Sequence, residues 1–98
     1  MDKKDKKINL VCDARLNKYF KITSEALEKA KKALNDKEFD RATDFLDMAQ
    51  RYYDDALHFK KKGHYVNAFA CLNYSHGWLD AGARAGFFKV NDSRLFTI

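Results

Sequence analysis

Apolar residues recur at steps of three and four in the first third of the chain, which is the spacing of one helix face. The recurring positions are Leu16, Phe20, Thr23, Leu27, Ala30 and Leu34. The lysines and glutamates of this stretch fall mostly outside the stripe. We therefore predict one amphipathic helix from about Leu10 to Leu34. Thr23 and Ser24 offer an alternative helix start, because both residue types cap helices, but the stripe continues through them unbroken.

A turn signal separates this helix from the next apolar pattern. Asn35 and Asp36 favour turns, because their side chains bond the local backbone. A second stripe follows at Ala42, Leu46, Ala49, Tyr53 and Ala56. Three lysines then precede Gly63, where cations suit the negative end of a helix and glycine can adopt the left-handed conformation that ends it. The pattern predicts a second helix from Glu38 or Asp40 to this glycine.

The third apolar segment, from about Tyr65 to Ala85, has apolar side chains on two faces. One face consists of Tyr65, Ala68, Phe69, Leu72, Leu79 and Ala83, and the second face of Ala70, Tyr74, Trp78, Ala81 and Ala85. A helix that is apolar on most of its circumference is buried on several sides. Gly77 and Gly82 lie inside this helix at a cost of about 1 kcal/mol each, which is easiest to accept where another backbone comes close.

The last twelve residues are apolar for a chain end, since they include Phe87, Phe88, Leu95 and Phe96. We expect this tail to cover part of the second face of the third helix. Short connections favour antiparallel neighbours. The predicted fold class is therefore all-α, an antiparallel up-down-up three-helix bundle with an apolar C-terminal tail folded back on it. We expect residues 10–98 to form a single domain and residues 1–9 to form a flexible basic arm.

Composition narrows the class of protein. The chain has 98 residues, no Pro and two Cys, and it is 46% hydrophobic and 34% charged. These proportions exclude a disordered chain, and no apolar run approaches the roughly 18 residues of a membrane span. Two cysteines cannot form a disulfide scaffold, and the N-terminus lacks the apolar segment of a secretory signal. We expect a cytoplasmic protein that does not associate with a membrane.

The positive charge is concentrated near the N-terminus. Residues 1–38 account for +4 of the net charge of +5. Its densest cluster consists of Lys3, Lys4, Lys6 and Lys7. A lysine arm of this kind binds nucleic acids through their phosphates, or it only solvates the chain end. A nucleic-acid-binding accessory protein that uses this arm and the first helix is therefore one candidate function.

Candidate chemistry gathers on a polar strip of the third helix, which consists of Asn73, His76, Asp80 and Arg84. An aspartate four residues from a histidine can orient and charge it, as catalytic dyads require. However, the nearest cysteine, Cys71, lies about 140° from His76 around the helix, so no nucleophile stands beside the pair. The alternative is that the strip has a structural role, either as a network of surface contacts or through a buried hydrogen bond.

Metal ligation and ribonuclease activity have little support. The histidines and cysteines show neither Cys-x-x-Cys nor His-x-x-x-His spacing, so we predict no metal and no cofactor. Arg51 and His58 have the spacing found in HEPN-type ribonucleases, and the two residue types suit phosphate binding and proton transfer. In one helix they are about 10.5 Å apart along the axis, too far to meet at one phosphate without a second subunit or a break.

Several segments resemble one protein family. They are residues 49–56, residues 63–68, residues 73–82 with their Tyr-x-x-Gly-Trp-Leu-Asp-Ala run, and the closing Leu-Phe-Thr-Ile. The chain resembles a small archaeal family known only as a domain of unknown function. His64 departs from this family, whose members often have an acidic residue after the glycine. The resemblance implies a compact three-helix fold in an archaeal cytoplasm, and it implies no activity or catalytic residue.

The leading function is a non-enzymatic helical module that binds a protein partner or itself. Tyr74 and Trp78 are residue types that anchor interfaces, and Gly77 permits a second helix to approach. The second face of the third helix is either covered by the first helix and the tail, or it is a dimer or partner interface. The candidate binding residues are Asn73, Tyr74, His76, Trp78, Asp80 and Arg84. We predict no catalytic residue.

Overall fold

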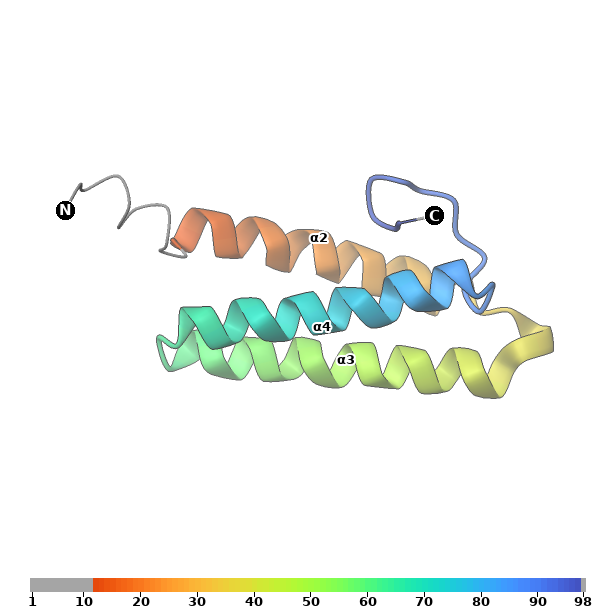
Figure 1. Cartoon of the computed structure of the whole chain (residues 1–98), viewed down its shortest axis with the longest axis horizontal. Helices are drawn as coiled ribbons and strands as arrows, with labels where there is room; N and C mark the ends of the chain where they lie inside the picture. Colours follow the sequence, from red (N-terminus) through yellow and green to blue (C-terminus); the bar gives the residue numbers. More distant parts are fainter. Residues whose placement is uncertain (1–11, 98) are drawn as a thin grey trace.

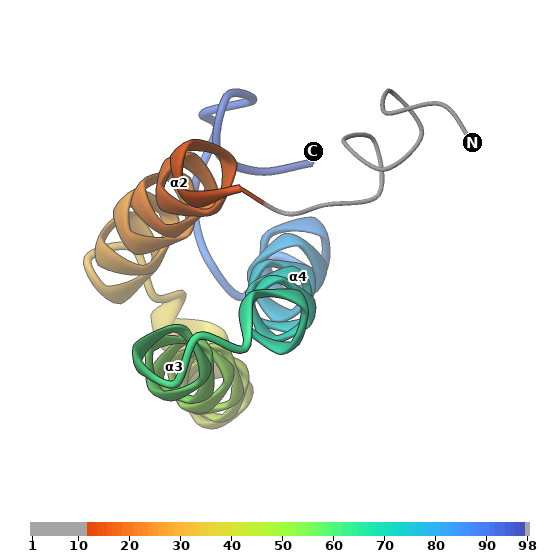
Figure 2. The ribbon, with the colours of Figure 1, turned by 90° about the vertical axis from the view of Figure 1, so that its left-hand side faces the viewer.

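The structure, a computed structural model, describes residues 12–97. Helix α2 spans Asp13–Lys31, the short 3-10 helix η1 spans Asp36–Glu38, α3 spans Phe39–Lys61 and α4 spans Tyr65–Arg84. Helices α2 and α4 run in one direction and α3 in the other (Figure 1), and the three lie at the corners of a triangle when viewed along their axes (Figure 2). The predicted all-α, up-down-up bundle is confirmed. None of the helices within these residues is both long and apolar enough to cross a membrane.

Helix α2 is continuous through Thr23, so this residue does not start a new helix. Its predicted start at Leu10 lies outside the described residues. The helix ends at Lys31, three residues earlier than predicted, because the chain beyond it pairs with the tail. Leu34 forms a β-bridge with Phe88. On either side of this bridge, the Lys89 amide donates to the Ala33 carbonyl at 2.7 Å and the Asn35 amide to the Phe87 carbonyl at 2.8 Å.

Glycine follows the end of both later helices, as predicted for Gly63. Gly63 has a φ of 78° and Gly86 a φ of 81°, in the left-handed region that glycine adopts without the strain of a side chain. The turn signal at Asn35 also has its expected role, since the Asn35 side chain accepts a hydrogen bond from the Lys37 amide at 3.1 Å and caps η1. Local sequence therefore accounts for the ends of α3 and α4 and for the start of η1, whereas the end of α2 depends on the tail.

Helices α3 and α4 meet along two rows of small residues, each spaced by seven. The row on α3 is Ala42, Ala49 and Ala56, and the row on α4 is Ala68, Ser75 and Gly82. All six are buried. The hydroxyl of Ser75 donates to the Ala49 carbonyl at 2.7 Å, which shows that the two backbones come close at this level. Small side chains permit this approach, since larger ones would hold the helices apart.

The core has two clusters along the bundle. One, near the start of α2, contains Leu16, Phe20 and Leu72. The other, near the end of α4, contains Leu79 together with three residues of the tail. The tail residues are Phe88, Leu95 and Phe96, each at most 2% exposed. The tail is thus part of the hydrophobic core, as its apolar composition predicted.

The position of the tail differs from the prediction in one respect. It lies against α2 and α4 (Figure 2), and Phe88 packs over Gly82, where a side-chain Cβ would overlap the ring. The second face of α4 is left uncovered, because Ala70, Tyr74 and Ala81 are exposed. The expectation that α2 and the tail would cover this face was wrong. The gap between α2 and α4 offers the tail more buried contact than the outer side of a single helix.

Candidate functional site

His76 of the predicted polar strip joins three parts of the fold. Its Nδ1 lies 3.1 Å from the Thr23 hydroxyl of α2, and its Nε2 lies 2.5 Å from the Leu95 carbonyl of the tail. A neutral ring with its proton on Nε2 donates to the carbonyl and accepts from the hydroxyl. Both ring nitrogens are therefore occupied by structural partners.

Asp80 anchors the same segment of the tail. Its carboxylate accepts from the Thr97 amide at 2.9 Å and from the Thr97 hydroxyl at 3.3 Å. The Nε2 of His76 lies 3.8 Å from this carboxylate. The predicted pair is thus assembled, but both members hold the tail. The other two residues of the strip, Asn73 and Arg84, are exposed and stand apart from these contacts.

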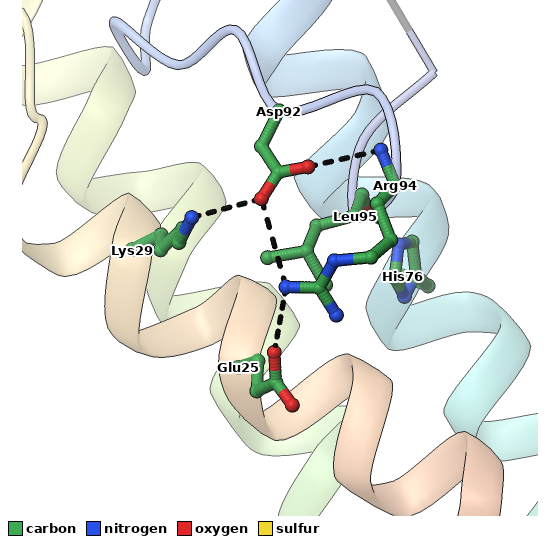
Figure 3. A network of polar contacts seen from close by, with 6 residues as sticks. All are labelled: Glu25, Lys29, His76, Asp92, Arg94 and Leu95. Atoms are coloured by element: carbon green, nitrogen blue, oxygen red, sulfur yellow. Dashed lines mark hydrogen bonds and ion pairs between the residues drawn. The ribbon is translucent and has the colours of Figure 1, made fainter.

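A second group of charges holds the tail on α2 (Figure 3). Lys29 donates to Asp92 at 2.8 Å, and Arg94 donates to Glu25 at 3.0 Å. Asp92 also accepts from the backbone amide of Arg94 at 3.0 Å. The hydrogen bond from Lys29 lowers the pKa of the Asp92 carboxyl below its ordinary value, and the charges of Lys29 and Arg94 act in the same direction.

A hollow of about 430 Å³ lies beside these anchors, between α2, α4 and the tail. Tyr19, Asn73 and His76 are among its lining residues. The hollow offers no activated nucleophile. The nearby Cys71 does not line it, and burial, with a smaller effect of the Asp55 charge, raises the pKa of the Cys71 thiol. Within residues 12–97, no group of three or more His, Cys, Asp or Glu side chains is placed to hold a metal ion.

We expect His76→Ala to lower the free energy of unfolding by about 1–3 kcal/mol, because the Leu95 carbonyl and the Thr23 hydroxyl lose their shared partner. Urea unfolding followed by circular dichroism measures the change. His58→Ala is the matched control, since His58 is exposed and we expect an effect within about 0.5 kcal/mol. Equal midpoints for the two variants would show that His76 does not hold the tail.

The second face of α4 carries exposed aromatic side chains. Tyr74 is 62% exposed and stacks on Tyr52 of α3, with ring centroids 5.2 Å apart. Trp78 is half-buried and meets Phe45 of α3 edge-on at 4.9 Å. Between them lies an open groove of about 460 Å³, whose floor includes Gly77. Large apolar groups exposed together in a groove are typical of a binding surface.

The helices differ sharply in the charge that they present to solvent. Seven of the ten exposed residues of α2 are charged, and eight of the eleven of α3. On α4 one of the eight exposed residues is charged, which is Arg84. The others are Val66, Asn67, Ala70, Asn73, Tyr74, Gly77 and Ala81. The α4 surface therefore resembles the core of an interface, from which charged residues are depleted.

The ribonuclease candidates lie on a different surface. Arg51 and His58 are exposed on the outer side of α3, and Arg51 donates to Asp47 at 2.8 Å. Residues 39–62 carry five acidic and five basic side chains, so this surface has no net charge that would attract RNA. The two residues lie in one continuous helix, about 10.5 Å apart along its axis, so the geometry does not bring them to one phosphate. The lysine arm of Lys3, Lys4, Lys6 and Lys7 lies outside the described residues.

Sequence reasoning did not identify the partners of the two candidate regions. Thr23 was assigned to the apolar stripe of its helix, and Thr97 had no role. The contacts of Phe45 and Tyr52 with α4 were not predicted either. The register of the α3–α4 hairpin would have paired them with Trp78 and Tyr74, whereas no local signal brings Thr23 or Thr97 to α4.

Comparison with known proteins gives a family without an assigned activity. No curated protein and no solved structure matches the chain significantly. One family model, described as a protein of unknown function (DUF357), matches residues 18–88. The matched segment covers more than two thirds of the chain, from α2 to the buried Phe88 of the tail. The chain therefore belongs to the DUF357 family of proteins of unknown function.

Proposed function

We propose that the protein is a non-enzymatic interaction module, which holds a helix of a protein partner on the exposed face of α4. We call this surface the α4 face and define it by Ala70, Tyr74, Gly77, Trp78 and Ala81. The observation that carries the proposal is the near absence of charge on the exposed side of α4, beside aromatic rings that neither α2 nor the tail covers. Aromatic anchors in a weakly charged surface are the usual centre of a protein interface.

The role of the polar strip supports a module without catalytic chemistry. The His76 ring and the Asp80 carboxylate make structural hydrogen bonds to the tail, and these bonds hold them in fixed positions. A general base needs a ring nitrogen that can reach its substrate. On the resemblance described above, we further propose that residues 10–98 act as a single domain in an archaeal cytoplasm.

The test compares two glutamate substitutions of exposed apolar residues. Tyr74→Glu places a charge on the α4 face, and Leu57→Glu places one on α3, about 140° around that helix from the groove residue Tyr52. Tagged wild-type protein and both variants are incubated with an extract of the source cells, and the solution mass of each is measured by light scattering. We expect Tyr74→Glu to abolish the capture of a partner or self-association, and Leu57→Glu to retain it. Identical behaviour of the two variants would contradict the proposal.

A specific observation supports a second candidate, nucleic-acid binding along α2. Arg15, Lys18 and Lys21 are exposed on this helix and form no ion pair with a described residue. Together with the N-terminal lysines they provide several phosphate contacts, and affinity would fall steeply as salt rises. Titration with RNA and DNA at low and at moderate salt tests this candidate. Absence of binding at low salt would exclude it.

A further inference from the structure

We infer that the occupant of the α4 face is a second copy of this chain, packed antiparallel so that each Tyr74 lies over Gly77 of the partner subunit. This inference rests on the proposed function and adds the partner and its register. Three observations carry it: a glycine without a role inside the single chain, the spacing of the exposed residues, and the way in which these residues complement one another.

Gly77 lies in the middle of α4 and is exposed. A Cβ built on it meets no atom of residues 12–97 within 4 Å, so this part of the chain does not require glycine here. Gly82 is different, because a Cβ there would overlap the Phe88 ring. Glycine inside a helix costs about 1 kcal/mol relative to alanine. No contact of Gly77 with the described residues offsets this cost, whereas the close approach of a second chain would offset it.

The exposed residues around Gly77 follow the spacing of a helix–helix seam. Steps of three and four alternate along Asn67, Ala70, Tyr74, Gly77, Ala81 and Arg84. This alternation is the heptad spacing by which one helix packs along another. Five of these six residues are uncharged, and the one charge lies at the end of the seam. A helix can therefore lie along it without burying an ion.

The six residues of this seam complement the same six residues of a second copy that runs in the opposite direction. When two copies pack antiparallel about a two-fold axis, Tyr74 of each opposes Gly77 of the partner subunit, and Ala70 opposes Ala81 of the partner subunit. Asn67 then lies level with Arg84 of the partner subunit, where the guanidinium donates to the amide oxygen. A parallel pair would instead place two Tyr74 rings in one layer and two glycines in the next. The antiparallel register avoids both the crowding and the void.

The area available suits a dimer. Helix α4 has 20 residues, so it is about 30 Å long and about 10 Å wide, and the edge of α3 widens the strip. A specific dimer buries roughly 600 Å² per copy, or about 1,200 Å² for the pair, so the contact must extend from α4 onto the edge of α3. The aromatic groove lies within this strip, because Tyr52 and Phe45 line it from α3.

The first test uses Gly77→Ala, which separates the single chain from the dimer. Added methyl groups would hold the two helices apart, so we expect the dimer dissociation constant measured by analytical ultracentrifugation to rise at least tenfold. In dilute protein the same substitution raises the urea midpoint, because alanine favours the helix and its Cβ meets no atom. Leu57→Ala, on the side of α3 away from the groove, leaves the dissociation constant unchanged. An unchanged constant in Gly77→Ala overturns the role of this glycine.

The second test determines the register. Ala70→Cys and Ala81→Cys are combined in one chain whose native Cys12 and Cys71 are replaced by serine, and circular dichroism verifies the fold. The two new cysteines are too far apart along one helix to bond within a chain. After mild oxidation, the antiparallel register gives disulfides between position 70 of one copy and position 81 of the other. Disulfides that join position 70 of one copy to position 70 of the other, and position 81 to position 81, would overturn the antiparallel register.

The same measurements distinguish this inference from the proposed function. A wild-type protein that remains monomeric at millimolar concentration overturns the dimer. If Tyr74→Glu then still prevents the capture of a different protein, the α4 face is an interface for that protein and the proposed function stands. If Tyr74→Glu changes neither mass nor capture, both the dimer and the proposed function fail.

Discussion

Replacement of Phe88 by alanine will lower the free energy of unfolding by about 3–5 kcal/mol. The Phe88 ring is 1% exposed and fills the space over Gly82, in the core cluster that joins the tail to α2 and α4. Its loss removes buried apolar surface and leaves a cavity, because the β-bridge to Leu34 keeps the backbone in place. Domains of this size are stabilised by about 5–15 kcal/mol in total, so the loss is a large fraction.

Phe39→Ala is the control for this substitution. Phe39 is 53% exposed at the start of α3, and its truncation has a much smaller effect on the urea midpoint. A double-mutant cycle with Gly82→Ala isolates the contact between the ring and the glycine. Gly82→Ala destabilises the wild-type protein and is tolerated when Phe88 is already alanine. Equal losses for Phe88→Ala and Phe39→Ala would contradict the position of the tail.

Ala49→Leu will destabilise the protein by about 3 kcal/mol, at the upper end of the usual cost of an overfilled core. Ala49 is fully buried between α3 and α4, and its carbonyl accepts a hydrogen bond from the Ser75 hydroxyl. A leucine at this level forces the helices apart and breaks that hydrogen bond. The separation also weakens the neighbouring levels, since Ala42 and Ala56 depend on the same close approach.

The control for this prediction is Ala14→Leu on α2. Ala14 is exposed, so the same added volume meets solvent and changes stability by about 0.5 kcal/mol or less. Both variants are unfolded in urea, and their midpoints are compared on the assumption that the unfolding free energy falls equally steeply with urea concentration. If Ala49→Leu has the same urea midpoint as the wild-type protein, the small residues do not set the spacing of α3 and α4.

Much of the fold could be predicted from local patterns. The apolar stripes identify the three helices, and Gly63 and Gly86 mark where two of them end, because these signals depend on residues within one or two turns. The end of α2 could not be predicted in this way. It depends on the pairing of Leu34 with Phe88, which lies more than fifty residues away in the chain.

The candidate site shows the same division. The pattern identified His76 and Asp80 as one strip, since they are four residues apart on one helix. Their partners Thr23, Leu95 and Thr97 come from α2 and the tail, so the structural role of the strip depends on where the tail lies. The two glycines of α4 are equivalent by sequence, and only their surroundings separate Gly82 under an aromatic ring from Gly77 in open space.

Helix periodicity and capping are local properties, so the residue pattern alone predicts the helices, their order and the apolar character of the tail. The tertiary structure decided which faces are covered. The tail lies between α2 and α4, where it buries Leu95 and Phe96 on two helices at once, and Tyr74 is left in solvent. Burial depends on the competition among all apolar faces for the same contacts, and that competition is settled only when the whole chain is packed.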